Sequence, residues 1–219
     1  MKVKQIVRNI RWLLVQMGLA TLLLSPVISL ANAADTDELQ SDNVQTVVEH
    51  LQQSLIQVMR KGEQLDFEER VEFLAPVINQ THDIELIIKT ILGATLWHEL
   101  DQPQQTLIIE TFRQLGVATY AGRFKAYSGE QFELLEQRDL PRDQKLVRSQ
   151  LVTGDGGGVS FDYVLHHLDD HWAIINILFD GVSDLAIKRS EYRSILQRDG
   201  FQSLVDMLNI KISEAEHLE

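Results

Sequence analysis

The chain has 219 residues with no cysteine, 20 basic and 32 acidic side chains, and a formal net charge of −12. The absence of cysteine excludes a framework held by disulfides, so the fold must rely on a hydrophobic core. A net charge of this sign repels phosphate backbones and anionic headgroups, which argues against nucleic-acid binding and against passive docking on a membrane surface.

The first 33 residues have the pattern of a secretory signal. Four basic residues precede an apolar run over 12–24, and the sequence Ala-Asn-Ala ends the segment at Ala33. Pro26 interrupts the apolar run before the roughly 20 residues that a membrane-spanning helix needs. We therefore expect cleavage after Ala33 and export to the periplasm. The signal carries four of the 20 basic residues and none of the 32 acidic ones, so the mature chain has a net charge near −16.

The first half of the mature chain is predicted to be helical. Residues 34–42 are polar and acidic, which indicates a flexible arm ahead of a single domain over residues 43–215. Apolar residues then recur at three- and four-residue steps up to Val58, with Asp42 as the expected N-cap and Gly62 just past the end. This pattern predicts an amphipathic helix.

Three further helices are predicted before residue 126. Asp66 opens the second helix of the chain, with Glu69 three residues later as in a capping box, and Pro76 is expected to bend or end it. The next helix carries four isoleucines and ends before Gly93. A longer helix is predicted from about Pro103 to Lys125.

After Gly129 the hydrophobic period changes to two. Runs over 131–138, 145–152, 159–168 and 172–179 are rich in β-branched and aromatic residues and are separated by turn residues, which predicts an antiparallel meander. Ser183 is expected to cap a helix that runs to about Arg198, and Gly200 to separate it from a last helix. The predicted class is α+β, with helices packed on one face of a curved four-stranded antiparallel sheet that encloses an apolar cavity.

A glycine run and three histidines could indicate a phosphate-binding or metal-binding site. The run over 154–158 leads into a strand, whereas a phosphate loop must lead into a helix, so a hairpin turn is the better interpretation. His166 and His167 are adjacent in a strand and point to opposite faces, and His171 falls in the next turn, which disfavours a metal site. No cysteine and no G-x-S-x-G nucleophile is present, so we expect no enzyme activity, metal or cofactor.

The last two predicted strands are more apolar than a one-sided sheet requires. Val159, Phe161, Tyr163 and Leu165 share one face of the third strand, and the fourth strand, which begins at Trp172, is apolar on both faces. Such strands are either wrapped by helices as ordinary core or have one face that lines a cavity. Periodicity alone leaves both interpretations open.

Three segments in this order resemble a known family. Residues 112–135 ("FRQLGVATYAGRFKAYSGEQFELL"), 159–196 ("VSFDYVLHHLDDHWAIINILFDGVSDLAIKRSEYRSIL") and 200–208 ("GFQSLVDML") are similar to the periplasmic lipid-binding family that includes the toluene-tolerance Ttg2D proteins and the MlaC component of phospholipid transport. The resemblance covers about residues 43–209. Within it, "RFKAYSGEQFELL" and "SDLAIKRSEYRSIL" further resemble the HpnM branch, which is associated with hopanoid biosynthesis.

Single positions also match the family pattern. The family has a tyrosine in the third strand, a tryptophan that opens the fourth, a Gly-Val-Ser before the next helix and a later Tyr-Arg, which this chain matches with Tyr163, Trp172, Gly181, Val182, Ser183, Tyr192 and Arg193. The family often has aspartate where this chain has Asn176.

The resemblance implies a monomeric lipid carrier of the periplasm. Such a protein hides the acyl chains of a phospholipid, or a hopanoid-type lipid, between sheet and helices and exchanges it with membrane-bound complexes at the inner and outer membranes, in transport linked to an ABC transporter. The side chains expected to contact the lipid are Phe124, Tyr127, Phe161, Tyr163, Leu165, Trp172, Ile174, Val182, Leu185 and Tyr192. A one-residue slip in a strand would exchange its two faces, so which face lines the cavity stays open.

Two other classes of function remain as alternatives. One is an enzyme or accessory factor of hopanoid metabolism that acts on a hydrophobic substrate through Asp162, His166 or His171. The other is an interaction protein with a filled core, which would hold no extractable ligand.

Overall fold

The computed structural model describes residues 43–153, 157–168 and 171–217, which belong to one compact unit, Ser41–Glu219. The predicted signal over 1–33 and the arm over 34–42 lie outside the described residues. The elements follow in the order α2 (Val44–Lys61), a 3-10 turn η1 (Gly62–Gln64), α3 (Phe67–Thr81), α4 (Ile84–Glu99), α5 (Gln102–Arg123), β1 (Gln131–Leu140), β2 (Gln144–Val152), β3 (Gly158–Leu168), β4 (His171–Phe179), β5 (Val182–Ser183) and α6 (Asp184–Ala215).

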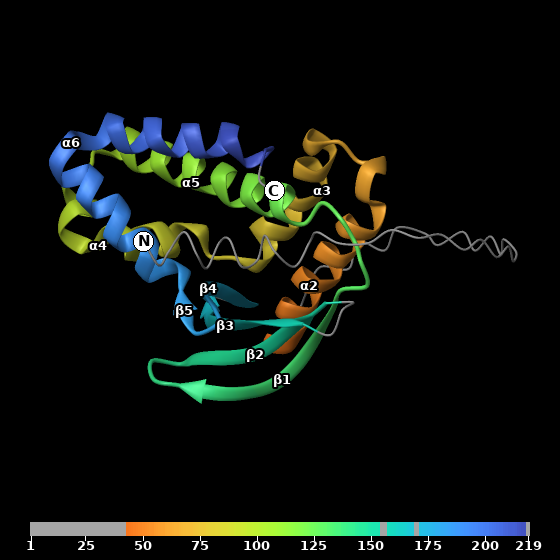
Figure 1. Cartoon of the computed structure of the whole chain (residues 1–219). Helices are drawn as coiled ribbons and strands as arrows, with labels where there is room; N and C mark the ends of the chain where they lie inside the picture. The colour runs from red at the N-terminus through yellow and green to blue at the C-terminus, as the bar shows by residue number, and fades with distance from the viewer. Residues whose placement is uncertain (1–42, 154–156, 169–170, 218–219) are drawn as a thin grey trace, which may run out of the picture. The chain divides into compact units, whose positions relative to one another are not determined.

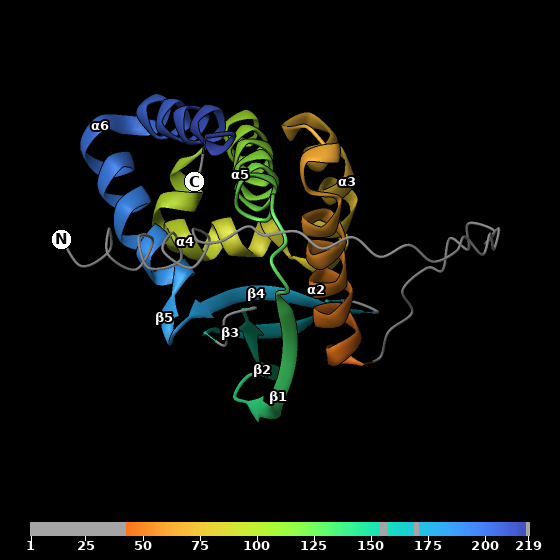
Figure 2. The same cartoon turned by 45° about the vertical axis from the view of Figure 1, so that its right-hand side comes forward.

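The helices lie on one side of a single antiparallel sheet (Figure 1 and Figure 2). The strand order is β1-β2-β3-β4-β5, so neighbours in the sheet are also neighbours in the chain. The predicted α+β class is confirmed. The sheet has five strands rather than four, because Val182 and Ser183 pair with Phe179 and Leu178 at the end of β4.

The helix starts follow the local capping chemistry. Asp66 and Glu69 exchange side-chain-to-backbone hydrogen bonds of 2.8 Å in each direction, which confirms the predicted capping box at α3. The prediction of Asp42 as the cap of α2 is wrong, because the Asn43 side chain accepts the hydrogen bond from Gln45 N at 3.0 Å. Asparagine and aspartate are nearly equivalent caps, so the sequence did not distinguish the two positions.

Two positions that were predicted to end or bend helices, Pro76 and Gly93, lie inside helices in the structure. The backbone of α3 stays helical through Pro76 to Thr81, where Val77 and Ile78 are buried. α4 continues past Gly93 to Glu99, with a break at Gly93 itself (φ 77°, ψ 161°). These angles lie in a region that is essentially accessible to glycine alone. The glycine therefore redirects the helix instead of ending it.

A long-range hydrogen bond holds the break in α4. The Arg193 side chain of α6 donates from Nε to the carbonyl oxygen of Leu92 at 2.7 Å. This carbonyl precedes the break, where the regular pairing of the helix is interrupted. The next residue of α6 towards the N-terminus, Tyr192, is buried and meets Phe112 of α5 edge to face at 6.3 Å. The Tyr-Arg pair therefore docks α6 on both α4 and α5.

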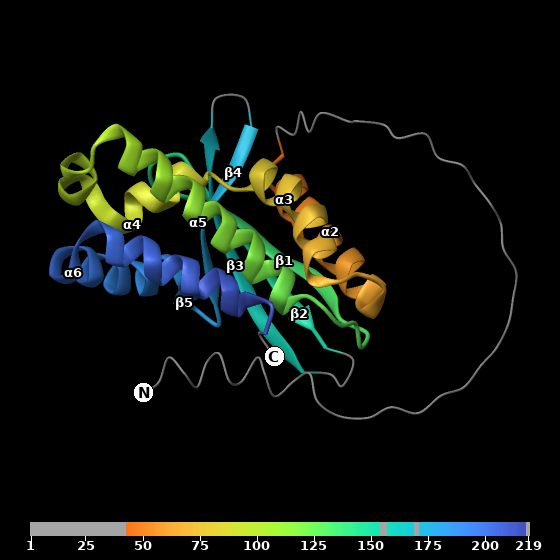
Figure 3. The same cartoon turned by 90° about the horizontal axis from the view of Figure 1, so that it is seen from above.

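A second glycine folds α6 back on itself. Ser183 caps the helix by accepting from Ala186 N at 3.1 Å, and Gly200 interrupts it (φ 86°, ψ 176°), both as predicted. The part after Gly200 runs beside α5 (Figure 1 and Figure 3). α5 packs mainly on α3, α4 and α6, whereas α2, α3, α4 and α6 contact β4. α5 is thus supported by other helices rather than by a strand.

One buried polar contact joins α2 to the sheet. The Gln52 amide nitrogen lies 2.9 Å from Ser149 Oγ on β2 and 3.4 Å from the Tyr163 hydroxyl on β3. Ser149 in turn donates to the carbonyl oxygen of Phe161 at 2.9 Å. The contact identifies the inner, helix-facing side of the sheet, which Phe161 and Tyr163 share because strand residues two apart point the same way.

Replacing Gly93 tests the break in α4. A Cβ at this position would lie 1.8 Å from Arg193 Nη2, and the backbone would be strained as well. We expect Gly93→Ala to lower the free energy of unfolding by about 3 kcal/mol. Gly116→Ala, at a helical glycine of α5 with open space around it, should instead raise it by about 0.5–1 kcal/mol. Urea denaturation measures both, and equal effects at the two glycines would contradict the account.

Removing the Gln52 amide tests the contact between α2 and the sheet. Gln52→Ala leaves the buried Ser149 and Tyr163 hydroxyls with fewer partners, so we expect a loss of about 1–3 kcal/mol in the free energy of unfolding. Gln53→Ala, at the exposed neighbour on the same helix, should change it by less than about 0.5 kcal/mol. Urea denaturation measures both variants. An unchanged free energy of unfolding in Gln52→Ala would show that this contact does not help to fix the position of α2 on the sheet.

Candidate functional site

Aromatic rings from three strands meet on the inner face of the sheet. Phe161 of β3 lies edge to face with Phe132 of β1 at 5.5 Å and with Phe179 of β4 at 4.9 Å, and it stacks near Tyr163 at 6.5 Å between ring centroids. We call these four residues the aromatic floor. Phe132 and Phe179 keep part of their surface accessible, whereas Phe161 and Tyr163 are buried.

The last turns of α5 place a second aromatic pair and a cation in the interior. Tyr120 stacks on Phe124 at 5.9 Å, and Arg123 lies one turn after Tyr120 on the same side of the helix. Tyr120 and Arg123 are surrounded by protein, and burial raises the pKa of Tyr120 and lowers the pKa of Arg123. Both nevertheless keep intermediate exposure.

A histidine links this region to the edge of the sheet. His82 joins α3 to α4 and pairs with Ile174 of β4 in an isolated bridge. Its Nδ1 lies 2.9 Å from Thr81 Oγ1, its Nε2 lies 3.3 Å from the Tyr120 hydroxyl, and its ring meets Tyr120 edge to face at 5.8 Å.

The hydrogen bonds of His82 assign its neutral tautomer. Thr81 already donates its proton to the carbonyl oxygen of Val77 at 2.7 Å, so His82 Nδ1 must be the donor to Thr81. His82 Nε2 then accepts from the Tyr120 hydroxyl. A proton on Nε2 would remove this bond, and burial lowers the pKa of His82 to about 4.

A small set of charges lies near the same place. Asp184 and Lys188, one turn apart at the start of α6, form an ion pair. The Asp184 carboxylate acts electrostatically on His82, Tyr120 and Arg123, which come from two other elements. We call His82, Tyr120, Arg123, Asp184 and Lys188 the polar cluster. The interior thus combines an aromatic floor with a polar cluster.

The structure distributes the ten predicted lipid-contacting residues over several places. Phe161 and Tyr163 belong to the aromatic floor, and Leu165 and Ile174 pair across β3 and β4 with no exposed surface. Phe124 stacks on Tyr120. For none of the ten does the structure test contact with lipid, so this role stays a prediction.

The other predicted residues are not members of the aromatic floor, although Val182 pairs with Phe179 between β4 and β5. Trp172 meets His167 at 5.2 Å and the Lys145 ammonium at 5.5 Å near the β3–β4 turn, and Tyr127 lies beneath the Arg60 guanidinium at 5.1 Å. Tyr192 packs among the helices. Val182 and Leu185 are partly exposed at the junction of β5 and α6.

Asn176 orders this junction. Its side-chain oxygen accepts from the Ser183 hydroxyl at 3.1 Å and from Leu185 N at 3.3 Å. An aspartate could accept the same two hydrogen bonds, so the departure from the family pattern at Asn176 preserves the contact.

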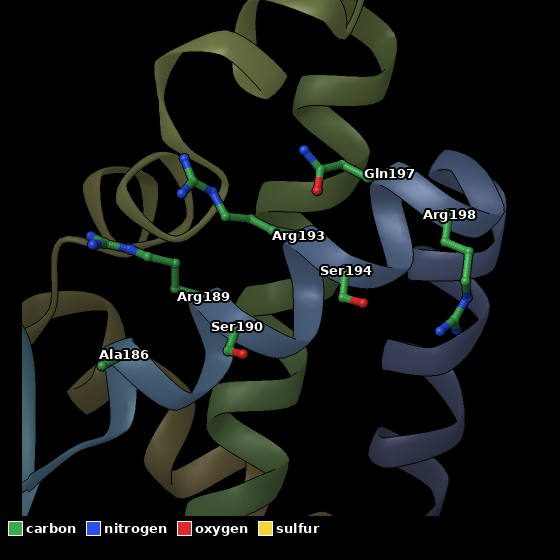
Figure 4. A pocket seen from close by; sticks show the side chains of 7 residues that line it. All are labelled: Ala186, Arg189, Ser190, Arg193, Ser194, Gln197 and Arg198. Carbon is green, nitrogen blue, oxygen red and sulfur yellow. The ribbon is translucent and has the colours of Figure 1, made fainter.

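Two surface hollows among the described residues lie elsewhere. One, of about 640 Å³, is lined by residues of α6 between Ala186 and Arg198 (Figure 4), where Arg189 and Arg193 extend to one side and Arg198 to another. The other, of about 340 Å³, lies between the C-terminal end of α4 and the first part of α6, around Leu100 and Leu196. None of the ten predicted residues lines either hollow. The predicted apolar cavity therefore stays a prediction.

The residues considered for catalysis or metal binding are separated. His166 Nε2 lies 2.9 Å from the Asp83 carboxylate, which also caps α4, and Asp162 is held by Arg148 at 3.4 Å and by Ser160 at 3.1 Å. Asp162 and His166 are four positions apart on β3, a spacing of roughly 13 Å. Among the described residues, no group of three or more His, Asp or Glu side chains could hold a metal ion.

Sequence reasoning missed several residues that define the interior. Phe132 and Phe179 carried the alternation of their strands and could have been included on that signal. The partners of Gln52 are 97 and 111 residues away, and Arg123 resembles any basic residue in the last turn of a helix. Local pattern does not reveal such long-range arrangements.

The lowered pKa of His82 predicts a pH dependence of stability. Between about pH 6.5 and pH 4 the unfolded chain binds a proton at His82 that the folded chain does not, so stability falls as the pH is lowered through this range. We expect His82→Gln to remove a dependence of up to about 1.4 kcal/mol per pH unit. His98→Gln, at an exposed histidine, should follow the wild type. Denaturation curves at several pH values measure this, and parallel curves for all three proteins would contradict it.

Comparison with known proteins identifies structural relatives and one family. The structure is similar to that of a phospholipid-binding protein from Ralstonia solanacearum, solved in complex with a phospholipid, with a TM-score of 0.66 and 20% sequence identity over 78% of this chain and 96% of that chain. This likeness supports the fold. No curated protein sequence matches the chain significantly. The family model described as MlaC protein matches residues 49–210, most of the chain, and the protein therefore belongs to the MlaC family.

Proposed function

We propose that this protein is a periplasmic lipid carrier that shields the acyl chains of a phospholipid or a hopanoid-type lipid between the sheet and the helices. The observation that carries the proposal is the aromatic floor, together with Tyr120 and Arg123, which retain exposure deep in the fold. Membership of the MlaC family supports it. The similar fold of the Ralstonia solanacearum protein, which binds a phospholipid, adds support.

The energetics of lipid transfer explain why such a carrier needs a shielded interior. Each methylene withdrawn from water contributes ~0.8 kcal/mol, so one acyl chain of ~16 carbons requires roughly 12 kcal/mol of shielding. Spontaneous release into water is correspondingly slow. The carrier must therefore unload onto an apolar acceptor, which we propose to be membrane-bound transport complexes at the inner and outer membranes, linked to an ABC transporter.

The location and the partners follow from charge and export. The segment over 1–33 would direct the chain to the periplasm, and among the described residues none of the helices combines the length and apolar character needed to cross a bilayer. A mature chain with a charge near −16 would dock as a monomer on basic surfaces of its partners. The separation of Asp162 from His166 favours a carrier over an enzyme.

Native mass spectrometry of protein purified from the periplasm without detergent tests the proposal directly. We expect a stoichiometric lipid adduct that is released on denaturation and that lipid extraction identifies as a phospholipid or a hopanoid. Protein that has only the mass of its chain, and that also takes up no lipid from vesicles, would overturn the proposal in favour of a filled core.

A charge placed on the aromatic floor should reduce lipid binding. Phe132 is partly exposed on the inner face, so Phe132→Asp introduces a carboxylate where acyl chains would lie, and we expect the lipid adduct to fall by about tenfold or more. Leu135→Asp is the matched control, because Leu135 lies on the same strand and is 59% exposed. Adduct intensity and circular dichroism are measured for both. Equal adducts in folded Phe132→Asp and Leu135→Asp would contradict the assignment.

A further inference from the structure

The two surface hollows adjoin each other on the first part of α6. The larger, of about 640 Å³, is lined by α6 residues between Ala186 and Arg198, and the smaller, of about 340 Å³, by Leu196 together with residues at the C-terminal end of α4. Gln197 lines both hollows, so they meet there. We call them together the α6 groove. Its lining side chains are different from those of the aromatic floor and the polar cluster.

The two ends of the α6 groove differ in chemistry. Three arginines, two serines and a glutamine line the larger hollow, and no carboxylate is among its lining residues. Three leucines, Leu96, Leu100 and Leu196, line the smaller hollow, with Glu99 beside them. A segment that lies along the groove therefore contacts arginines at one end and leucines at the other.

Two of the three arginines keep free hydrogen-bond donors. Arg198 is occupied, because its guanidinium donates to both carboxylate oxygens of Asp199 at 2.6–2.9 Å. Arg193 uses its Nε to donate to Leu92, and Arg189 is exposed. In the part of the chain that the structure describes, no group accepts a hydrogen bond from Arg189 or from the terminal nitrogens of Arg193. Both guanidinium groups extend to the same side of α6, so one partner can reach both (Figure 4).

The charge of the larger hollow is opposite to that of the chain. An unpaired arginine on a surface is ordinary by itself, but here the chain has a formal net charge of −12 and only arginines carry charge among the residues that line the hollow. Arg193 is already held by its hydrogen bond to Leu92, so a partner immobilises fewer side-chain rotamers on binding. A patch of opposite sign attracts an acidic partner and fixes its orientation, because the rest of the surface repels it.

Shape and charge disfavour two other occupants of the α6 groove. A second copy in a symmetric dimer would place the arginines of one copy against those of the other. A flat bilayer surface does not fill a concave hollow, and a net charge of −12 repels its anionic headgroups. A helix of another protein is convex. Two carboxylates one turn apart on such a helix have the same spacing as Arg189 and Arg193, which are themselves one turn apart on α6.

We propose that the α6 groove is a docking site for an acidic amphipathic helix of a partner protein. Carboxylates of this helix accept hydrogen bonds from Arg189 and from the terminal nitrogens of Arg193, while its apolar side chains cover Leu100 and Leu196. The serines of the larger hollow have small side chains, which allow a second helix to approach closely. The inference concerns a protein partner and does not depend on the proposed carrier function.

Binding of designed peptides tests the inference. A fluorescein-labelled helical peptide carries glutamates one turn apart beside a stripe of leucines, and a matched peptide has glutamines in place of the glutamates. Fluorescence anisotropy measures the dissociation constant of each peptide. We expect the acidic peptide to bind at least about tenfold more tightly than the neutral one. Non-specific binding to a chain of net charge −12 would give the opposite order, because the chain repels the acidic peptide.

Three variants separate the parts of the α6 groove. Arg189→Glu should reverse the preference, so that the neutral peptide binds more tightly. Arg138→Glu, at an exposed arginine of β1, makes the same change in net charge and should behave like the wild type. Leu196→Ser, at the apolar end, should weaken the binding of both peptides by about tenfold. Circular dichroism confirms that each variant is folded, and Arg189→Gln, which should abolish the preference, provides a second test of the charge.

The possible outcomes distinguish the proposed partner from the other occupants. Wild-type protein that prefers the neutral peptide, or Arg189→Glu and Arg138→Glu variants that bind alike, would refute the docking site. Self-association of the wild type in analytical ultracentrifugation that Arg189→Glu abolishes would identify a second copy as the occupant. Binding to dioleoyl phosphatidylglycerol vesicles that Arg189→Glu abolishes would identify a membrane surface, and either result would overturn the inference.

The lipid adduct keeps this inference distinct from the carrier function. Because the α6 groove and the aromatic floor have different lining residues, Arg189→Glu should retain the lipid adduct of the wild type in native mass spectrometry. Loss of the adduct in folded Arg189→Glu would make the groove part of the lipid site and would also overturn the inference.

Discussion

The interior depends on the contact that fixes α2 to the sheet. Gln52 reaches two strands with one amide, because Ser149 of β2 and Tyr163 of β3 present hydroxyls on the same face. A buried hydrogen bond contributes little net free energy when it is made, but a buried polar group left without its partner costs more. The main effect of the contact is therefore to disfavour other registers of the strands. That register turns Phe161 and Tyr163 towards the helices and leaves Asp162 on the opposite face, beside Arg148.

The helical layer is shaped by two glycines that break helices without ending them. Gly93 and Gly200 adopt backbone angles that are essentially restricted to glycine, and each redirects a helix so that both of its parts pack on neighbours. α4 thereby meets the first part of α6, and the second part of α6 supports α5. Because helices rather than strands carry α5, its inward side chains can be large, polar or charged without being compressed against the sheet.

The features that could be predicted from the sequence are those determined by neighbouring residues. The Asp66 and Glu69 capping box, the Ser183 cap, the break at Gly200 and the four longer strands each follow from a pattern within a few residues. The errors concern competition between similar local signals. Asn43 and the preceding aspartate are equally good caps. A glycine such as Gly93 is expected both at the end of a helix and at a break within one, so the sequence does not distinguish the two cases.

The candidate site was less predictable, because its members are joined by long-range contacts. Tyr163 was predicted from the alternation of its strand, but its partner Gln52 occupies an ordinary position of an amphipathic helix. Tyr120 likewise occupies an ordinary position of a helix, so the sequence does not mark it as part of the site. The resemblance to the family directed attention to β3 and β4, and so it missed Phe132 on β1 and the polar cluster.

The charge of the protein also bears on how a carried lipid would be released. The chain has a formal net charge of −12 and so opposes the approach of anions, although salt screens this repulsion beyond about 8–10 Å. Under the proposed function, affinity would come from the acyl chains on the aromatic floor rather than from a charged headgroup. Unloading would then depend on an acceptor whose basic groups attract the acidic carrier while its apolar surface takes the chains.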